Sequence, residues 1–481
     1  MLLAFDQNPP VLSPLPKKAI RAAGPVFAAN ELSYPLLAGA MDRVIARREG
    51  RPVTAASLLR DAWALAEVLP DRPFVLNLCE NRYRFLVGFA AALLRGQISL
   101  LPPNRAMLAL RHLAETHPGA YCLTECDDQP EGLERFVYPC EAVAASRCEP
   151  QNPLIPADRI VAIAFTSGTT GQSQPHPKSW GTFCESARLI AESLGIPAGS
   201  SASLFATVPP QHMYGLETTI LVPLCHGGAS DERKPFFPAD VCLALESVSG
   251  PRILITTPVH LRACLQEGRP LPALDFIVSA TATLSKELAE SAERLCETRV
   301  MEIYGCTEAG SIACRRTTEG PLWQAFEGVR FVDTGKGGRN VKAKHLPEPV
   351  SLNDLIEVYS AGRFSLHGRV ADLVNVAGKR TSLGALNQAH CEVDGVRDGA
   401  FFMPDESEDK TTRLIAFAVA PGLSARAILA ELKTRIDPIF LPRPLYLIDA
   451  LPRAETGKLS RHALEELAAR LSDLRQGARD D

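Results

Sequence analysis

One stretch decides the fold: Ile160-Val161-Ala162-Ile163-Ala164-Phe165-Thr166-Ser167-Gly168-Thr169-Thr170-Gly171. Its first half is an apolar run rich in β-branched residues, which predicts a buried strand. Its second half contains only Gly, Ser and Thr, and a loop of this kind offers backbone N–H groups and hydroxyls to the oxygens of a polyphosphate. The alternative is a polar surface loop, because the same residues are common in ordinary turns.

Helical patterns alternate with short apolar runs on both sides of this stretch. Because strands that alternate with helices form βαβ units, we expect an α/β fold with parallel sheets covered by helices. The predicted helices are 54–69, 83–94, 106–116 and 182–194, and the predicted strands are 73–78, 98–103, 120–123, 203–208, 252–257, 276–279 and 299–304.

The pattern changes beyond Gly320, where short strands and turns replace the Ala-rich helices. We therefore expect a large N-terminal domain over residues 1–369, which includes a β-rich subdomain at 320–368. A small α+β domain follows over residues 370–481 and ends in a helix from 460 to 474. A chain of 481 residues is long enough for this number of cores.

Composition narrows the class of protein. A hydrophobic content of 46% and a charged content of 22% are typical of a globular protein. The net charge of −4 gives no electrostatic reason to expect nucleic acid as a partner. The 13 cysteines include no C-x-x-C pair, so they are interpreted as reduced residues of a cytoplasmic protein. We expect neither a signal peptide nor an integral membrane segment, because no apolar run is long enough.

Four separated stretches carry a family resemblance. Residues 166–171 resemble the Thr-Ser-Gly-Thr-Thr-Gly phosphate loop of the adenylate-forming enzymes, a superfamily of acyl- and aryl-CoA synthetases, nonribosomal peptide synthetase adenylation domains and luciferases. Residues 304–308 resemble its Tyr-Gly-x-Thr-Glu motif, and residues 368–380 its interdomain Gly-Arg-x-Asp-Asp…Gly-x-Arg segment. Residues 452–458 resemble its C-terminal Pro-x-x-x-x-Gly-Lys motif.

The resemblance implies attack of a carboxylate on the α-phosphate of ATP, which is catalysed mainly by positioning and electrostatic stabilisation. It assigns Thr307 to the α-phosphate, Glu308 to Mg²⁺ and Lys458 to the charge that develops during attack. The further ATP contacts that it implies are Thr166, Ser167, Gly168, Thr169, Thr170 and Gly171 at the phosphates, Ser279, Ala280, Thr281 and Tyr304 at adenine, and Asp354 and Arg369 at the ribose. Plainer alternatives are a solvated acid at 308, a surface lysine at 458, an ion-pair arginine at 369 and a core aromatic at 304.

The same resemblance implies a site for the acyl group between the loop after strand 203–208 and the Tyr-Gly segment. Its residues are His212, Tyr214, Gly215, Gly305 and Cys306. We interpret the first two as a small pocket with polar handles, suited to a hydroxybenzoate-like acid. A fatty acid remains an alternative for the substrate, and a packing role remains one for His212. The acceptor is the phosphopantetheine thiol of CoA or of an acyl carrier protein, which passes near Gly378 by resemblance.

The sequence also departs from the family. The usual loop lysine is replaced by Gln174, so a cation near the pyrophosphate is missing unless Lys178 supplies it. At the position of the first Asp of the family's hinge pair, this chain has Ala371. This departure puts the hinge movement between the two reaction steps in doubt. Together with the Gln-Pro-His-x-Lys-x-Trp stretch at 174–180, these departures resemble stand-alone ligases that load aryl acids onto acyl carrier proteins in pigment and polyene pathways. A second hypothesis is a nucleotide-binding regulator that lost turnover.

Overall fold

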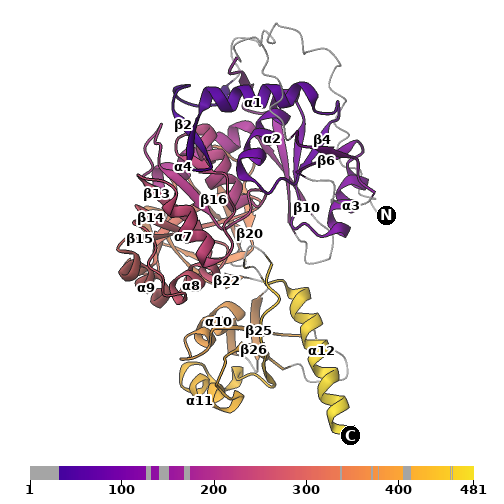
Figure 1. The fold of residues 1–481 in the computed structure, drawn as a ribbon. Coiled ribbons are helices and arrows are strands. Elements are labelled where there is room, and N and C mark those ends of the chain that lie inside the picture. Colours follow the sequence, from indigo (N-terminus) through magenta and orange to yellow (C-terminus); the bar gives the residue numbers. More distant parts are fainter. Residues whose placement is uncertain are drawn as a thin grey trace.

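The computed structural model describes residues 32–125, 132–139, 151–166, 174–335, 338–369, 372–376, 379–404, 413–454, 457 and 459–480. Two large sheets with their helices form the upper part of the molecule in Figure 1, and a small C-terminal part lies below them. Several predicted site residues lie outside the described residues: Ser167, Gly168, Thr169, Thr170, Gly171, Ala371, Gly378 and Lys458.

The first sheet has six strands in the order β10-β9-β5-β4-β6-β7. It is parallel except at its edge, where β10 runs antiparallel to β9. Asn81 caps the helix α2 through its side chain, and Gly96 ends that helix in the left-handed conformation at φ 76°. The elements are β4 (Phe74–Asn77), β5 (Ile98–Leu101), β6 (Ala120–Thr124), β7 (Arg135–Val137), β9 (Ile160–Thr166), β10 (Gln174–Ser179), α1 (Ala55–Val68), α2 (Arg82–Arg95) and α3 (Met107–Thr116).

The second sheet has eleven strands in the order β21-β22-β17-β16-β15-β14-β13-β11-β12-β2-β3, and its central strands are parallel. Its strands are β2 (Val44–Arg48), β3 (Arg51–Thr54), β11 (Ser203–Ala206), β12 (Ala229–Asp231), β13 (Arg252–Thr256), β14 (Phe276–Ser279), β15 (Arg299–Cys306), β16 (Gly310–Arg316), β17 (Trp323–Ala325), β21 (Asp354–Val358) and β22 (Arg363–Arg369). Its helices are α4 (Trp180–Leu194), α5 (Met213–Leu216), the π-helix η1 (Glu217–Leu221), α6 (Val222–Cys225), α7 (Pro238–Glu246), α8 (Pro258–Gln266) and α9 (Lys286–Cys296).

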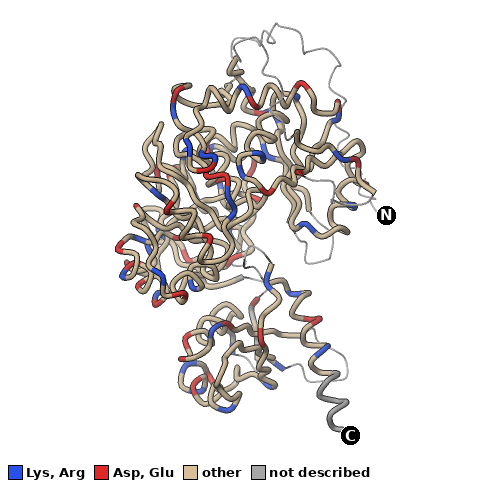
Figure 2. Tube along the Cα trace, viewed as in Figure 1, with Lys and Arg blue, Asp and Glu red and all other residues tan. Residues whose placement is uncertain are grey.

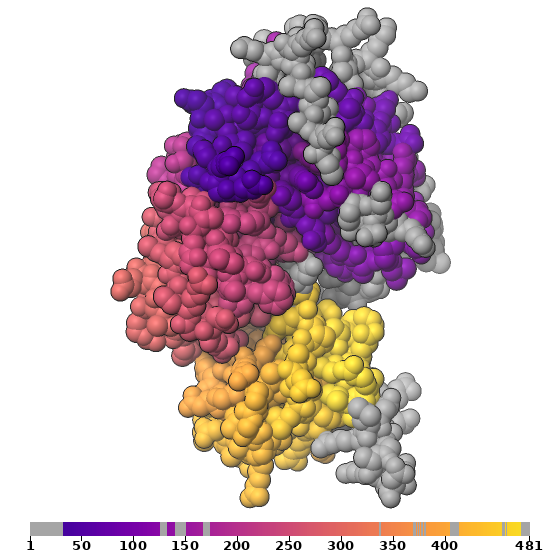
Figure 3. Space-filling view, viewed as in Figure 1, coloured from indigo at the N-terminus to yellow at the C-terminus, as the bar shows by residue number. Residues whose placement is uncertain are grey.

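The C-terminal part has its own apolar clusters, built from residues between 374 and 471. In the space-filling view it lies, orange and yellow, against one end of the larger part (Figure 3). Its elements are β23 (Leu373–Val376), β24 (Lys379–Ser382), β25 (Asp398–Phe402), β26 (Ile415–Val419), β27 (Leu445–Leu447), α10 (Leu383–Cys391), α11 (Ala425–Arg435) and α12 (Arg461–Asp480). None of the described helices is both long and apolar enough to cross a membrane.

The α/β fold with parallel sheets is confirmed, and the predicted helices and strands lie within a few residues of those observed. The elements that were not predicted include the helices α7, α8 and α9. The hairpin β2–β3 arises from a stretch with little periodicity and adds an edge to the second sheet. The predicted β-rich subdomain is divided between two sheets: β17, β21 and β22 join that sheet, while β18 (Arg330–Asp333), β19 (Arg339–Lys342) and β20 (Val350–Leu352) form a sheet of their own. Two short strands near the start, β1 (Ser33–Pro35) and β8 (Leu154–Pro156), pair with each other.

His390 makes the C-terminal part sensitive to acid. Its side chain is fully buried on α10, neither ring nitrogen has a hydrogen-bond partner among the described residues, and its ring meets Phe401 edge-on at 5.4 Å. Burial lowers the pKa of His390 to about 4, although Asp398 opposes the shift. The folded state therefore binds this proton less readily than the unfolded state.

We expect this part to lose about 3 kcal/mol of stability as the pH falls from about 6.5 to about 4. His390→Leu should flatten that dependence, because it removes the group that must stay neutral. Urea unfolding followed by circular dichroism at pH 7.5 and pH 5 tests this, with the exposed His462→Leu as control. An unchanged pH dependence in His390→Leu would contradict the assignment.

Candidate functional site

The candidate site lies at one edge of the second sheet. Strands β11, β13, β14 and β15 run parallel, and their register pairs Ala206 with Ile255, Thr256 with Ser279, and Ser279 with Glu302. Their carboxyl ends therefore meet at the same edge, where open α/β sheets bind ligands. The segments that follow these strands contain most of the predicted acyl and adenine contacts.

A hydrogen bond joins two predicted nucleotide contacts. The Tyr304 hydroxyl donates to Asp354 Oδ2 over 2.8 Å, although the residues lie 50 positions apart. The Tyr304 ring also packs against Trp323 and Phe364, with centroid distances of 5.6 and 5.8 Å. Asp354 lies opposite Arg369 in the β21–β22 register, so the backbone of the second predicted ribose residue is adjacent. A carboxylate at this edge suits the paired hydroxyls of a ribose, because it accepts hydrogen bonds through two oxygens.

The predicted adenine wall follows β14. Ser279 is fully buried, its Oγ has no hydrogen-bond partner among the described residues, and Ala280 is also buried. Thr281 has φ 77°, a left-handed conformation that is strained for a β-branched residue. Strained backbone of this kind is common at ligand sites. The orphaned hydroxyl and the small side chains fit a polar, flat group such as a nucleotide base.

The turn 307–309 connects β15 to β16 and carries half-buried Thr307 and Glu308. A Cβ on Gly305 would come within 2.3 Å of the Gly310 carbonyl oxygen, so this tight hairpin needs glycine. Cys306 Sγ accepts a hydrogen bond from the Ala309 N–H at 3.4 Å, and burial raises the pKa of this thiol to about 12. The thiol therefore stays neutral, and Cys306 has no nucleophilic role at neutral pH.

Strand β10, the partner of β9, contacts this turn from the other sheet. Lys178 on β10 donates from Nζ to the Glu308 carbonyl oxygen over 2.5 Å, and its side chain is 3% exposed. Thr166 Oγ1 lies 3.3 Å from His176 Nε2, and burial lowers the pKa of this imidazole while Glu308 opposes the shift. The strands that flank the predicted phosphate loop are thus tied to the Thr-Glu turn.

The predicted acyl residues have structural roles of their own. Tyr214 is 5% exposed, and its hydroxyl donates to the Val278 carbonyl oxygen at 3.0 Å, so this polar handle is already engaged by β14. A Cβ on Gly215 would lie 2.1 Å from the Pro209 carbonyl oxygen. Half-buried His212 accepts at Nδ1 from the Tyr214 N–H at 3.3 Å and caps α5.

The loop that carries Lys458 contacts the larger part at the same edge. A Cβ on Gly457 would lie 3.5 Å from Thr257 Oγ1, at the end of β13. Arg453 holds this loop, because it donates to the Gly457 carbonyl oxygen and binds both carboxylate oxygens of Asp398, each at 2.8 Å. Sequence analysis missed Arg453 and Asp398, whose pairing across 55 residues has no local signal.

Among the described residues, no group of three or more His, Cys, Asp or Glu side chains could hold a metal ion by itself. A single carboxylate such as Glu308 nevertheless fits Mg²⁺, which is commonly bound by one or two carboxylates together with substrate phosphates and water. When bound, the ion would neutralise phosphate charge beside this residue.

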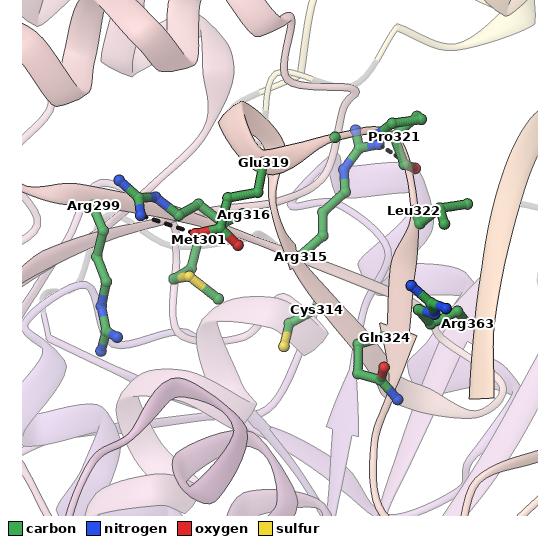
Figure 4. A pocket seen from close by; sticks show the side chains of 11 residues that line it. Arg299, Met301, Cys314, Arg315, Arg316, Glu319, Pro321, Leu322, Gln324 and Arg363 are labelled. Carbon is green, nitrogen blue, oxygen red and sulfur yellow. Dashed lines mark hydrogen bonds and ion pairs between the residues drawn. The ribbon is translucent and has the colours of Figure 1, made fainter. Parts of the chain in front are cut away.

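A pocket of about 510 Å³ lies elsewhere, on β15–β17 and β22, and arginines dominate its lining (Figure 4). Arg315 binds Glu302 at 2.7 Å, and Arg316 binds Glu293 and Glu319. Carboxylates therefore already neutralise much of its charge. Along the described part of the trace, basic and acidic residues are interspersed (Figure 2).

Parallel strand ends, a carboxylate suited to a ribose and a Thr-Glu turn at the same sheet edge are the features of an adenylate-forming enzyme. The chain belongs to the AMP-binding enzyme family, whose pattern matches residues 37–327. It is an AMP-forming acid–thiol ligase, which activates a carboxylic acid with ATP.

Two similar proteins are named as CoA ligases. A methyl-dioxo-octahydroindenyl-propanoyl:CoA ligase from Mycobacterium tuberculosis is 27% identical over 423 residues, which cover 79% of each chain. A 4-coumarate–CoA ligase from Rhodobacter capsulatus is 26% identical over 301 residues, 62% of this chain and 74% of that protein.

Solved structures confirm the fold. ATP-bound MatB from Rhodopseudomonas palustris matches with a TM-score of 0.74 at 19% identity, over 89% of this chain and 96% of that chain. The o-succinylbenzoate CoA synthetase MenE from Bacillus subtilis, in complex with its acyl-adenylate intermediate, also gives 0.74, at 18% identity over 88% and 95%.

Tyr304→Phe should weaken ATP binding about five- to tenfold, because Asp354 loses the hydroxyl that fixes its carboxylate. The KM for ATP and a calorimetric Kd measure this effect. Tyr359→Phe is the matched control, since its hydroxyl also binds a β21 carboxylate, Glu357, at 2.9 Å but on an exposed surface. Equal losses in both variants would contradict a nucleotide role for the Tyr304–Asp354 pair.

Proposed function

We propose that the protein activates an aryl acid such as a hydroxybenzoate and transfers it to the phosphopantetheine thiol of an acyl carrier protein. In the first step the carboxylate attacks the α-phosphate of ATP, and pyrophosphate leaves as the acyl-adenylate forms. In the second step the thiol attacks the acyl carbonyl, a proton leaves the sulfur, and AMP is released. The observation that supports a nucleotide-dependent reaction is the gathering of Asp354, Tyr304 and the turn 307–309 at one sheet edge.

The residue roles follow from this proposal. Thr307 donates to the α-phosphate, Glu308 takes Mg²⁺, and Lys458 neutralises the charge between carboxylate and phosphate. Residues 166–171 bind the phosphates, Ser279 to Thr281 hold the base, and Asp354 with Arg369 binds the ribose. The chain acts as two domains, 1–369 and 370–481, with Ala371 at the position of the family's hinge, and the thiol enters near Gly378.

The choice of acid rests on several observations. Curated relatives carry ring-bearing acids in their names, among them 4-coumarate and 4-chlorobenzoate. Half-buried His212 is a polar group beside the predicted pocket, and it could bind a ring hydroxyl. We propose that Cys306 and apolar residues of the buried helical segment 213–225 line the same pocket. We place the acyl group between His212 and the segment Gly305–Cys306.

The choice of acceptor rests on the departures at Gln174 and Ala371 and on the stretch 174–180, which resemble carrier-loading ligases. An aryl- or fatty acyl-CoA synthetase is the second candidate, and the names of the relatives favour it, since both ligases described above use CoA. A catalytically impaired nucleotide-binding regulator is the third, favoured by the missing loop lysine.

Lys458→Ala should lower acid-dependent pyrophosphate exchange by at least about 100-fold, because the variant lacks the cation that stabilises the developing charge. The exposed Lys433→Ala, in the same part of the chain, is the control and should keep the wild-type rate. Thermal unfolding of both variants shows that the fold is intact. A Lys458→Ala variant with normal exchange would remove this lysine from the reaction.

A panel of acids, offered with CoA or with a holo-acyl carrier protein, should give the fastest pyrophosphate release with hydroxybenzoates and carrier protein. Release is quantified by a coupled assay, and the loaded carrier is identified by intact mass. Faster turnover with CoA would select the synthetase, and a preference for fatty acids would overturn the aryl substrate. ATP binding without exchange on any acid would select the regulator.

A further inference from the structure

Lys178 is buried in a place where a charge is unfavourable. It lies on the edge strand β10 opposite Ala162, and 97% of its side chain is removed from solvent, since 3% is exposed. Burying an ammonium group costs several kcal/mol unless other groups compensate it. Burial lowers the pKa of Lys178, and the negative charges of Glu217 and Glu308 oppose that shift. The compensation therefore comes from the Thr-Glu turn and from a second buried residue.

That second residue is Glu217, which is 2% exposed and opens the π-helix η1. Its carboxylate accepts hydrogen bonds from Ser186 Oγ at 2.8 Å, from Ser311 Oγ at 2.6 Å and from the Ser311 N–H at 3.2 Å. A Cβ on Gly310 would lie 2.5 Å from Glu217 Oε1, and this glycine has φ 76°, so only glycine allows the approach. π-helical turns are frequent at functional sites.

The two buried charges, Lys178 and Glu217, hold the turn 307–309 at two separate points. Lys178 binds the carbonyl oxygen of Glu308 within the turn, while Glu217 binds Ser311 just after it. One anchor comes from the six-stranded sheet and the other from the helix that follows β11. The turn is thereby fixed between two bodies of the fold, while the side chains of Thr307 and Glu308 remain half-buried.

We propose that Lys178 and Glu217 are positioning residues, a buried pair of opposite charges that fixes the backbone on which Thr307 and Glu308 are presented to the triphosphate and its metal ion. The inference rests on the proposed function. In this proposal both residues act through the turn and not through contact with substrate. An error of about 1 Å in such a turn is enough to lower a rate about 100-fold.

Hydrogen exchange tests the positioning directly. In the full-length protein, Lys178→Met keeps the length of the side chain and removes the ammonium, and Glu217→Gln keeps the shape and removes the charge. Both variants should speed exchange in peptides covering residues 303–316, with Lys286→Met on the exposed face of α9 as control. Unchanged exchange in both variants would overturn the proposal. This readout needs no acid substrate.

Kinetics supply the second test. Lys178→Met should lower the kcat of acid-dependent pyrophosphate exchange about 100-fold. The KM for the acid should stay within about threefold of the wild-type value, because the turn and not the acyl pocket is displaced. Lys178→Arg should recover much of the rate. The double variant Lys178→Met/Glu217→Gln leaves no buried charge at this site, so it should stay folded and have a low kcat. A wild-type kcat in this double variant would overturn the proposal.

A further variant separates positioning from simple charge supply. If Lys178 only replaced the cation missing at Gln174, then Gln174→Lys should rescue Lys178→Met. We expect no rescue, because a lysine at the exposed start of β10 cannot bind the Glu308 carbonyl; rescue would overturn the positioning role. Failure of the proposed function gives a different result. The wild-type protein would then show no pyrophosphate exchange with any acid, while residues 303–316 would still exchange hydrogen more slowly in the wild type than in Lys178→Met.

Discussion

The parallel register of β11, β13, β14 and β15 is the constraint on which the site depends. It fixes the ends of four strands at one edge, so that a histidine loop, a small-residue wall and the Thr-Glu turn become neighbours although they span about a hundred residues. Parallel strands need covering helices, and the long Ala- and Leu-rich segments of the sequence supply them. The position of the reaction follows from this arrangement, and the chemistry follows from the side chains placed there.

The six-stranded sheet supplies the strands on either side of the predicted phosphate loop. The Gly/Ser/Thr loop leaves β9, which belongs to the six-stranded sheet, and β10 returns antiparallel along it. Lys178 connects this edge to the carbonyl oxygen of Glu308 on the other sheet. The contact holds the loop's strands against the turn that carries the proposed metal ligand, and two sheets with separate hydrogen-bond ladders thereby share one site.

The sequence predicts many of the strands and helices and several of the site residues. Strand and helix positions follow local periodicity, and the Tyr-Gly-Cys-Thr-Glu segment identifies its own strand end. Buried Lys178 and Glu217 were not readable, since a lysine in a strand and a glutamate in a Thr-rich segment both suggest solvent exposure. The engagement of the Tyr214 hydroxyl by Val278 also depends on a contact 64 residues away, which no local pattern encodes. Long-range partners thus account for what sequence analysis missed.

The candidate site is organised by the protein itself. The Tyr304 hydroxyl orients the Asp354 carboxylate, the group that is proposed to bind the ribose hydroxyls. Lys178 fixes the turn through a main-chain oxygen, which leaves the Glu308 carboxylate available for a metal ion. Arg453 holds the loop of the C-terminal part through the Gly457 carbonyl oxygen. Lys178 and Arg453 therefore each hold a segment of the site through a main-chain oxygen. Electrostatic catalysis requires such an arrangement, because donors and charges stabilise a transition state most when they need no reorganisation during the reaction.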